Sequence, residues 1–322
     1  MVGRMNPLLR MLVQRLGLAM LSLLLVSVVV FTITAVLPGD AAEELLGQDA
    51  TPETLAALRV QMGLDQPLAM RYLHWLGGLV TGNPGRSLVS DAPVMELIGN
   101  RLPNSLLLAA VTAAIAVPLA LLLGTLAAVF RGSWLDRLLN NGAVALVSVP
   151  EFLIATIAVL VLSVQLGWLP ALSYASDIDS FSGAVRVFVM PVLTLCCVTV
   201  AQMMRMTRAA LADQLDAAYI EMARLKGVPP VRLVLLHAMP NAIGPIANAV
   251  ALSTSYLLGG VIVIETIFHY PGVAKLMVDG VSQRDIPLVQ TCTMIFCAGY
   301  LLLVMLADMV GILANPRLRH AR

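Results

Sequence analysis

The sequence predicts an all-α integral membrane protein with about six transmembrane helices, a scaffold segment on the periplasmic side and a long cytoplasmic loop. Of the 322 residues, 59% are hydrophobic and only 12% are charged. A soluble domain carries roughly 25% charged residues, so this chain has too little charge to cover a water-facing surface. Mean hydropathy is +0.88. The formal net charge of +1 indicates no nucleic-acid partner.

Several apolar runs are long enough to cross about 30 Å of hydrocarbon. They cover residues 11–37, 103–130, 138–166, 187–204, 243–264 and 287–313. The first run is longer than the core of a cleaved signal and ends without a small-residue cleavage site, so we expect a retained helix. Pro118 and Pro150 lie within runs, which membrane helices tolerate when neighbours satisfy the freed carbonyls.

The distribution of lysine and arginine predicts the orientation. With a cytoplasmic N-terminus, 13 of the 20 basic residues fall on the inside, although the outside segments are longer. The inside residues are Arg4, Arg10, Arg15, Arg131, Arg137, Arg205, Arg208, Arg224, Lys226, Arg232, Arg317, Arg319 and Arg322. The positive-inside rule therefore places both termini in the cytoplasm of a bacterial inner-membrane protein.

Two segments between the runs are too long to be simple connections. The outer segment follows the first helix, up to about residue 101, with helical stretches at 52–62 and 66–79. The inner segment covers 205–241. We therefore expect residues 1–102 to form the first helix plus a periplasmic scaffold, and 103–322 to form a five-helix core that carries the inner loop.

The inner loop has the local signals of two short helices joined by a turn. Asp213 or Asp216 can cap the first helix, and Gly227 can end it in a left-handed conformation. Pro230 or Val231 can open the second helix. Tyr219, Met222 and Leu225 would then offer apolar contacts to a partner groove. An amphipathic helix lying at the lipid surface is the alternative.

The order of residues in this loop resembles a known signature. Glu221 and Ala223 are followed by three residues and then Gly227. Nine further residues separate Gly227 from His237-Ala238-Met239-Pro240. This resembles the coupling loop of bacterial ATP-binding-cassette importer permeases. Met222, His237 and Met239 depart from its usual alanine, isoleucine and leucine.

Other motifs are similar to the dipeptide, oligopeptide and nickel permease group, in particular its first permease. They are Leu37-Pro38-Gly39-Asp40, Met62-Gly63-Leu64-Asp65-Gln66-Pro67, Ala223-Arg224-Leu225-Lys226-Gly227, Glu265-Thr266-Ile267-Phe268, Pro271-Gly272, Arg284-Asp285-Ile286-Pro287 and Asn315-Pro316-Arg317-Leu318-Arg319. The resemblance covers nearly the whole chain.

The resemblance implies a heterodimeric channel with a second, homologous permease. Two ATP-binding-cassette ATPase subunits would supply ATP and Mg chemistry, and an external solute-binding protein would deliver a dipeptide or oligopeptide. The residues implied to couple to the ATPases are Asp216, Ala217, Tyr219, Glu221, Met222, Ala223, Arg224, Lys226, Gly227 and Pro240. Nickel or a metal chelate, or an opine-like solute, is the alternative cargo.

The sequence contains no phosphate-binding loop, zinc-protease motif or nucleophile elbow. We therefore expect no catalytic residue, no metal site and no cofactor in this chain, and we interpret its four cysteines as small apolar residues. An ion-coupled secondary transporter remains an alternative, as does a membrane enzyme or scaffold.

Intramembrane charge is costly and marks functional candidates. Glu151 lies in the middle of the third run, Glu265 near the outer end of the fifth and Asp308 in the last. A carboxylate paired with the backbone or a sister subunit is the alternative use, and it is the one we favour for Asp308. The candidate residues of a translocation path are Glu151, Ser253, Ser255, Gly259 and Glu265. The small residues among them, Ser253, Ser255 and Gly259, serve close helix packing equally well.

Overall fold

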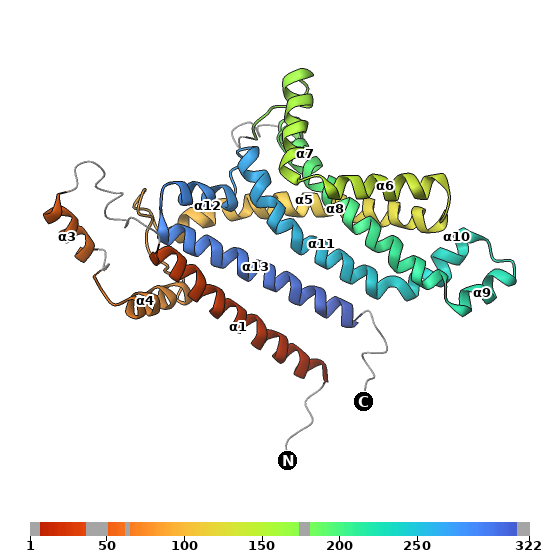
Figure 1. The fold of residues 1–322 in the computed structure, drawn as a ribbon, viewed down its shortest axis with the longest axis horizontal. Helices are drawn as coiled ribbons and strands as arrows, with labels where there is room; N and C mark the ends of the chain where they lie inside the picture. The colour runs from red at the N-terminus through yellow and green to blue at the C-terminus, as the bar shows by residue number, and fades with distance from the viewer. Residues whose placement is uncertain (1–6, 37–50, 62–64, 174–180, 314–322) are drawn as a thin grey trace, which may run out of the picture. The chain divides into compact units, whose positions relative to one another are not determined.

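The computed structural model describes residues 7–36, 51–61, 65–173 and 181–313. Within these ranges every named element is a helix (Figure 1). Five helical stretches are long and apolar enough to cross a membrane, and a bent helix pair adds a sixth, so the prediction of about six is confirmed. The motifs at 37–40, 62–64 and 315–319 and both chain ends lie outside the described residues.

The third apolar run is not the single helix that the sequence suggested. Helix α6 spans Trp134–Ser148 and α7 spans Glu151–Ala158, followed by a π-helix (η2) at Val159–Gln165. The two halves are bent by 98° at the break. Proline offers no N–H and forces the residue before it out of the helical region, and Val149 indeed has extended backbone angles of φ −91° and ψ 128°. Glu151 is therefore the first residue of α7, not a mid-helix residue.

The chain divides into two compact units. Unit 1 consists of residues 1–105 and 271–301. It contains α1 (Pro7–Val36), α3 (Pro52–Gln61), α4 (Leu68–Val80) and α12 (Val273–Ser282). It also contains the first part of α5 (Val94–Val129) and most of α13 (Ile286–Leu313). Helices α3 and α4 are observed where helical stretches were predicted, and a small apolar core holds α5, α12 and α13 together.

A buried carboxylate fixes the loop before α5 in unit 1. Asp285 is only 1% exposed. It accepts hydrogen bonds from the Ser87 hydroxyl and from the Leu88 N–H, the latter at 3.2 Å. The Leu288 N–H in the first turn of α13 also points to it, at 3.4 Å. One side chain therefore caps α13 and holds the loop at 87–88.

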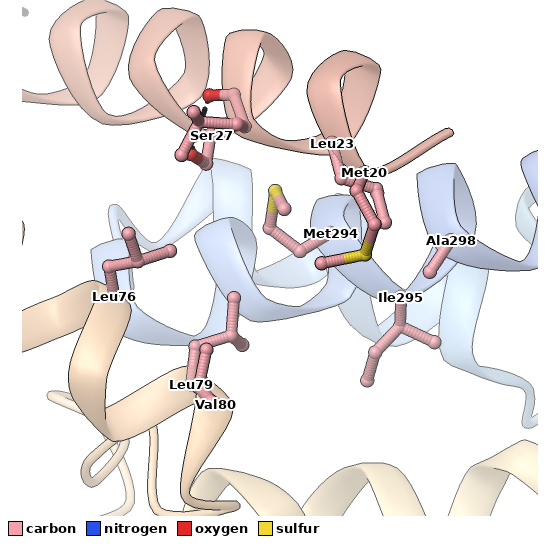
Figure 2. A pocket seen from close by; sticks show the side chains of 10 residues that line it. Met20, Leu23, Ser27, Leu76, Leu79, Val80, Met294, Ile295 and Ala298 are labelled. Atoms are coloured by element: carbon pink, nitrogen blue, oxygen red, sulfur yellow. Dashed lines mark hydrogen bonds between the residues drawn. The ribbon is translucent and has the colours of Figure 1, made fainter. Parts of the chain in front are cut away.

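Unit 1 also contains an apolar cavity of about 430 Å³ between α1, α4 and α13 (Figure 2). Met20, Leu79 and Met294 are among its lining side chains. Ser27 is the polar member, and its hydroxyl is satisfied by hydrogen bonds with the Leu24 carbonyl and the Tyr72 hydroxyl. The cavity therefore offers no unsatisfied polar group that would orient a ligand.

Unit 2 consists of residues 106–270 and 302–322. Its centre is the pairing of α8 (Phe181–Leu215) with α11 (Met239–Ile267). The buried side chains of this core are mostly alanine, leucine, valine and methionine. Helix α5 approaches α8 closely, since a Cβ atom added at Gly124 would lie 2.7 Å from the Thr207 Cβ. Small residues permit such contacts between membrane helices.

Candidate functional site: the connection between α8 and α11

The residues between α8 and α11 form a bent connection, which we call the elbow (residues 216–241). It contains α9 (Ala218–Leu225), the short α10 (Pro230–Arg232) and a π-helix (η4) at Leu233–Ala238. In Figure 1, α9 and α10 lie where α8 ends and α11 begins. The predicted turn between two helices is therefore observed. The first helix is short, as predicted, whereas the second begins at Pro230 and continues without a break into α11 as one helical stretch to Ile267.

Helix α9 buries one face and exposes the other. Ile220 is fully buried and Ala223 is 9% exposed. Tyr219, Met222 and Leu225 on the opposite side are 42%, 58% and 77% exposed. The exposed apolar contacts expected from the sequence are thus present. Met222 and Leu225 form a surface that α9 does not use for its own packing.

The buried face of α9 joins a cluster that draws on several helices. Ile220 and Ala223 pack with Leu211 of α8, Ala242 of α11 and Ala128 of α5. Leu233 and Val234 of the π-helix complete the contact. Because close-packed interiors transmit displacement, movement of α9 would be passed to α5, α8 and α11 together.

The turn after α9 is a Schellman motif. The Gly227 N–H donates to the Arg224 carbonyl at 2.9 Å, and the Val228 N–H donates to the Ala223 carbonyl at 3.2 Å. Gly227 has φ +78°, a region that residues with a Cβ enter at a cost of about 1–2 kcal/mol. Pro230 is the first residue of α10. The predictions that Gly227 ends the first helix in a left-handed conformation and that Pro230 opens the second are confirmed.

The predicted cap of α9 is wrong. Helix α8 continues to Leu215, so Asp213 lies inside it. Ala217 occupies the N-cap position, and no side chain caps the helix. Asp216 instead pairs with Arg131, with 2.9 Å between Nη1 and Oδ1. An ion pair with a residue far away in the sequence has replaced the local cap.

A second, more buried ion pair lies beside the elbow. Asp136 of α6 is 4% exposed. The Arg208 guanidinium donates to both of its oxygens, at 2.5 Å from Nε and 2.8 Å from Nη2. The Gly132 N–H donates to the same carboxylate at 2.9 Å. The turn between α5 and α6 is thereby attached to α8 at one point and to Asp216 at another.

Three polar side chains connect the elbow to its flanking helices. The Tyr219 hydroxyl donates to Oε1 of Gln214 at 3.0 Å and accepts from the Asn241 amide at 3.1 Å. The Asn241 amide also donates to the His237 carbonyl at 3.1 Å. His237 has its Nδ1 3.4 Å from the Arg232 carbonyl. These contacts hold α8, α9 and α11 in one arrangement.

The predicted coupling residues are mostly on the surface of the elbow. Glu221, Arg224, Lys226 and Pro240 are exposed. Ala223 is the buried exception, and it packs in the apolar cluster beneath α9. The ion-pair residues Arg131, Asp136 and Arg208 were not predicted from the sequence. Arg131 and Arg208 entered only the count of basic residues, and no local pattern pairs residues so far apart.

The candidate translocation-path residues differ in their burial. Ser253, Ser255 and Glu265 are buried, whereas Gly259 is exposed. The carboxylate of Glu151 lies against Gly260, where an added Cβ would be 2.7 Å from Oε1 and 2.9 Å from Oε2. Ser253 lies seven residues before Gly260 and has no hydrogen-bond partner for its Oγ among the described residues. The path assignment stays a prediction.

The long apolar helices define the class of protein, a multi-pass membrane protein. The chain belongs to the family of binding-protein-dependent transport system inner membrane components, whose pattern it matches over residues 120–320. The N-terminal pattern of the same transport systems matches residues 8–109. It is thus an inner-membrane transport permease and not an enzyme.

Curated relatives cover nearly the whole chain. A protein of Brucella abortus strain 2308, named as a peptide transport system permease, is 36% identical over 312 residues, which are 96% of this chain and 99% of the relative. The glutathione transport system permease protein GsiC of Escherichia coli K12 is 36% identical over 299 residues, which are 93% of this chain and 95% of the relative. The resemblance to the peptide permease group is therefore confirmed.

Proposed function

We propose that this chain is one of two homologous permease subunits that form the translocation pathway of a peptide importer driven by ATP. Two ATPase subunits would hydrolyse ATP with Mg, and an external solute-binding protein would deliver the cargo. The names of the relatives, peptide and glutathione transport, support peptides as the cargo. Both termini and the elbow would face the cytoplasm, as the excess of basic residues there indicates.

The observation that carries the coupling role is that one face of α9 is apolar and exposed, while its other face is packed against neighbouring helices. Met222 and Leu225 are 58% and 77% exposed, and a groove on a partner can accept such a helix. The other face of α9 packs against α5, α8 and α11. A partner that holds α9 can therefore move these helices as a group.

The transport cycle would be alternating access by rigid-body movement. ATP binding would draw the two ATPase subunits together, and each subunit would carry one permease elbow with it. ATP can shift the equilibrium only if it binds the two states with different affinity. The Schellman turn, the hydrogen bonds of Tyr219 and the two ion pairs keep the elbow from bending under that force.

Copurification tests the assignment. The permease purified from native membranes should bring with it a protein that contains a phosphate-binding loop. Leu225→Glu places a charge in the proposed apolar contact, and we expect it to abolish copurification while membrane insertion is kept. Met222→Leu is the matched control and should retain the partner. Transport by the purified chain alone in proteoliposomes without ATP would instead establish a secondary transporter.

Cargo is tested separately, on the external binding protein. Calorimetric titration of that protein with dipeptides, oligopeptides, nickel chelates and opines should show peptide binding. Preference for a nickel chelate or an opine would replace the peptide assignment and leave the coupling role intact.

Normal peptide uptake by Glu151→Gln would remove that carboxylate as a recognition site for a cationic group of the cargo.

A further inference from the structure

A cavity lined in part by polar side chains lies between α6 and α8, beside the buried ion pair. Its volume is about 410 Å³. Its lining consists of Asn140, Gln202, Arg205, Met206, Arg208 and Ala209. Two of these residues are arginines, two carry neutral amides and none is acidic. The cavity therefore favours an anionic occupant.

The two arginines differ in their availability. Arg208 is committed to Asp136, which accepts both of its donated hydrogen bonds. Arg205 is exposed, and no hydrogen bond or ion pair of its guanidinium occurs among the described residues. Asn140 and Gln202 likewise have no side-chain hydrogen bond within the described ranges. The Arg208 charge is balanced, so Arg205 supplies the net positive charge of the cavity.

The cavity lies at the end of the apolar run of α8 and at the start of the apolar run of α6. Arg205 directly follows the apolar run at 187–204, and Asn140 lies two residues into the run at 138–166. Trp134, at the start of α6, is 73% exposed. Exposed tryptophans are typical of the boundary between lipid and water. A ligand in this cavity would thus be at the level of phospholipid headgroups.

We propose that the cavity binds the phosphate of an anionic phospholipid of the inner leaflet. The guanidinium of Arg205 can donate two parallel hydrogen bonds to a phosphate, and the amides of Asn140 and Gln202 supply further donors. Val144, which is 41% exposed, lies one turn after Asn140 on the same side of α6 and can contact an acyl chain. Basic pockets between membrane helices on the cytoplasmic side recognise anionic headgroups in this way. The leaflet rests on the orientation proposed above.

The test uses the permease copurified with its partner subunits in a neutral detergent. Titration with phosphatidylglycerol or phosphatidylcholine is followed by native mass spectrometry and by thermal unfolding. We expect retained phosphatidylglycerol and a raised unfolding midpoint, with no comparable effect of phosphatidylcholine. Arg205→Gln should weaken phosphatidylglycerol binding by about tenfold, and Arg205→Lys, which keeps the charge but not the planar fork, should weaken it less.

Arg137→Gln is the matched control, because Arg137 is an exposed arginine of α6 outside the cavity. It should bind phosphatidylglycerol within twofold of the unaltered protein. An equal loss in both glutamine variants would overturn the proposal, since general surface charge would explain it. Equal protection by inorganic phosphate, or displacement of the lipid by a peptide, would also overturn it. In detergent both sides of the protein are accessible to lipid. The result of this measurement therefore does not depend on which side of the membrane the cavity faces.

Discussion

Arg208 of α8 and Asp136 of α6 form a bidentate ion pair next to the elbow, with 2.8 Å between Nη2 and Oδ2. Their side chains are 25% and 5% exposed. Arg131 and Asp216 form the neighbouring pair, with side chains 47% and 67% exposed. The same turn between α5 and α6 is thus held by one sheltered and one solvated ion pair.

The two pairs should differ in their contribution to stability. Asp136→Ala leaves a partly buried guanidinium unpaired, and we expect the free energy of unfolding to fall by about 3 kcal/mol. Asp216→Ala removes an exposed pair and should lower it by less than about 1 kcal/mol. Thermal unfolding of the two variants in detergent measures this difference. A larger effect of Asp216→Ala would contradict the assignment of Asp136 as the principal brace.

Gly260 should not tolerate a methyl group. Gly260→Ala brings Cβ to 2.7 Å from the Glu151 carboxylate, and overpacking of this kind lowers stability by about 1–3 kcal/mol. Gly259→Ala is the control, because no atom lies within 4 Å of its added Cβ. The double variant Gly260→Ala with Glu151→Ala should recover part of the loss. Additive losses in thermal unfolding would show that the two residues are not in contact.

Asp285 should protect the loop before α5 from proteases. Asp285→Ala leaves the Ser87 hydroxyl and the N–H groups of Leu88 and Leu288 without their acceptor. We expect a loss of about 2 kcal/mol and faster cleavage within residues 82–93 in limited proteolysis. Asp91→Ala is the control, since Asp91 is exposed and pairs with Arg86. Equal cleavage rates in both variants would rule out the anchoring role.

Gly227 should be required for its backbone angle and not for lack of space. No atom lies within 4 Å of its added Cβ, yet its φ is +78°. Gly227→Val should therefore distort the elbow and reduce uptake per ATP hydrolysed severalfold, whereas Gly227→Asn should stay near the original because asparagine tolerates this region. Uptake and hydrolysis are measured together in proteoliposomes of the whole importer. Full coupling in Gly227→Val would contradict a stiff elbow.

The spans and the turn at Gly227 were predictable because their signals are local. An apolar run of about 20 residues has few alternatives to a membrane helix, and a glycine with prolines two and three residues later is a typical helix end. The outer helices α3 and α4 were also anticipated within two residues at each end.

Other features depend on residues far away in the sequence and were not predictable. Asp216 directly precedes the N-cap residue of α9, Ala217, and its carboxylate pairs with Arg131 of another loop. Pro150 is compatible with a kink, a tolerated proline or a full break, and only packing against α8 and α11 selects the 98° bend. The contact of Glu151 with Gly260 follows from that bend.

The bend at Val149 and Pro150 also restricts what can surround this part of the chain. An interrupted helix leaves peptide groups without their regular partners, and hydrocarbon tails cannot hydrogen bond to them. Acyl chains are therefore an unfavourable solvent for this stretch. Polypeptide or water should therefore surround the bend at Val149 and Pro150, and α8 and α11 of this same chain already pack against α7.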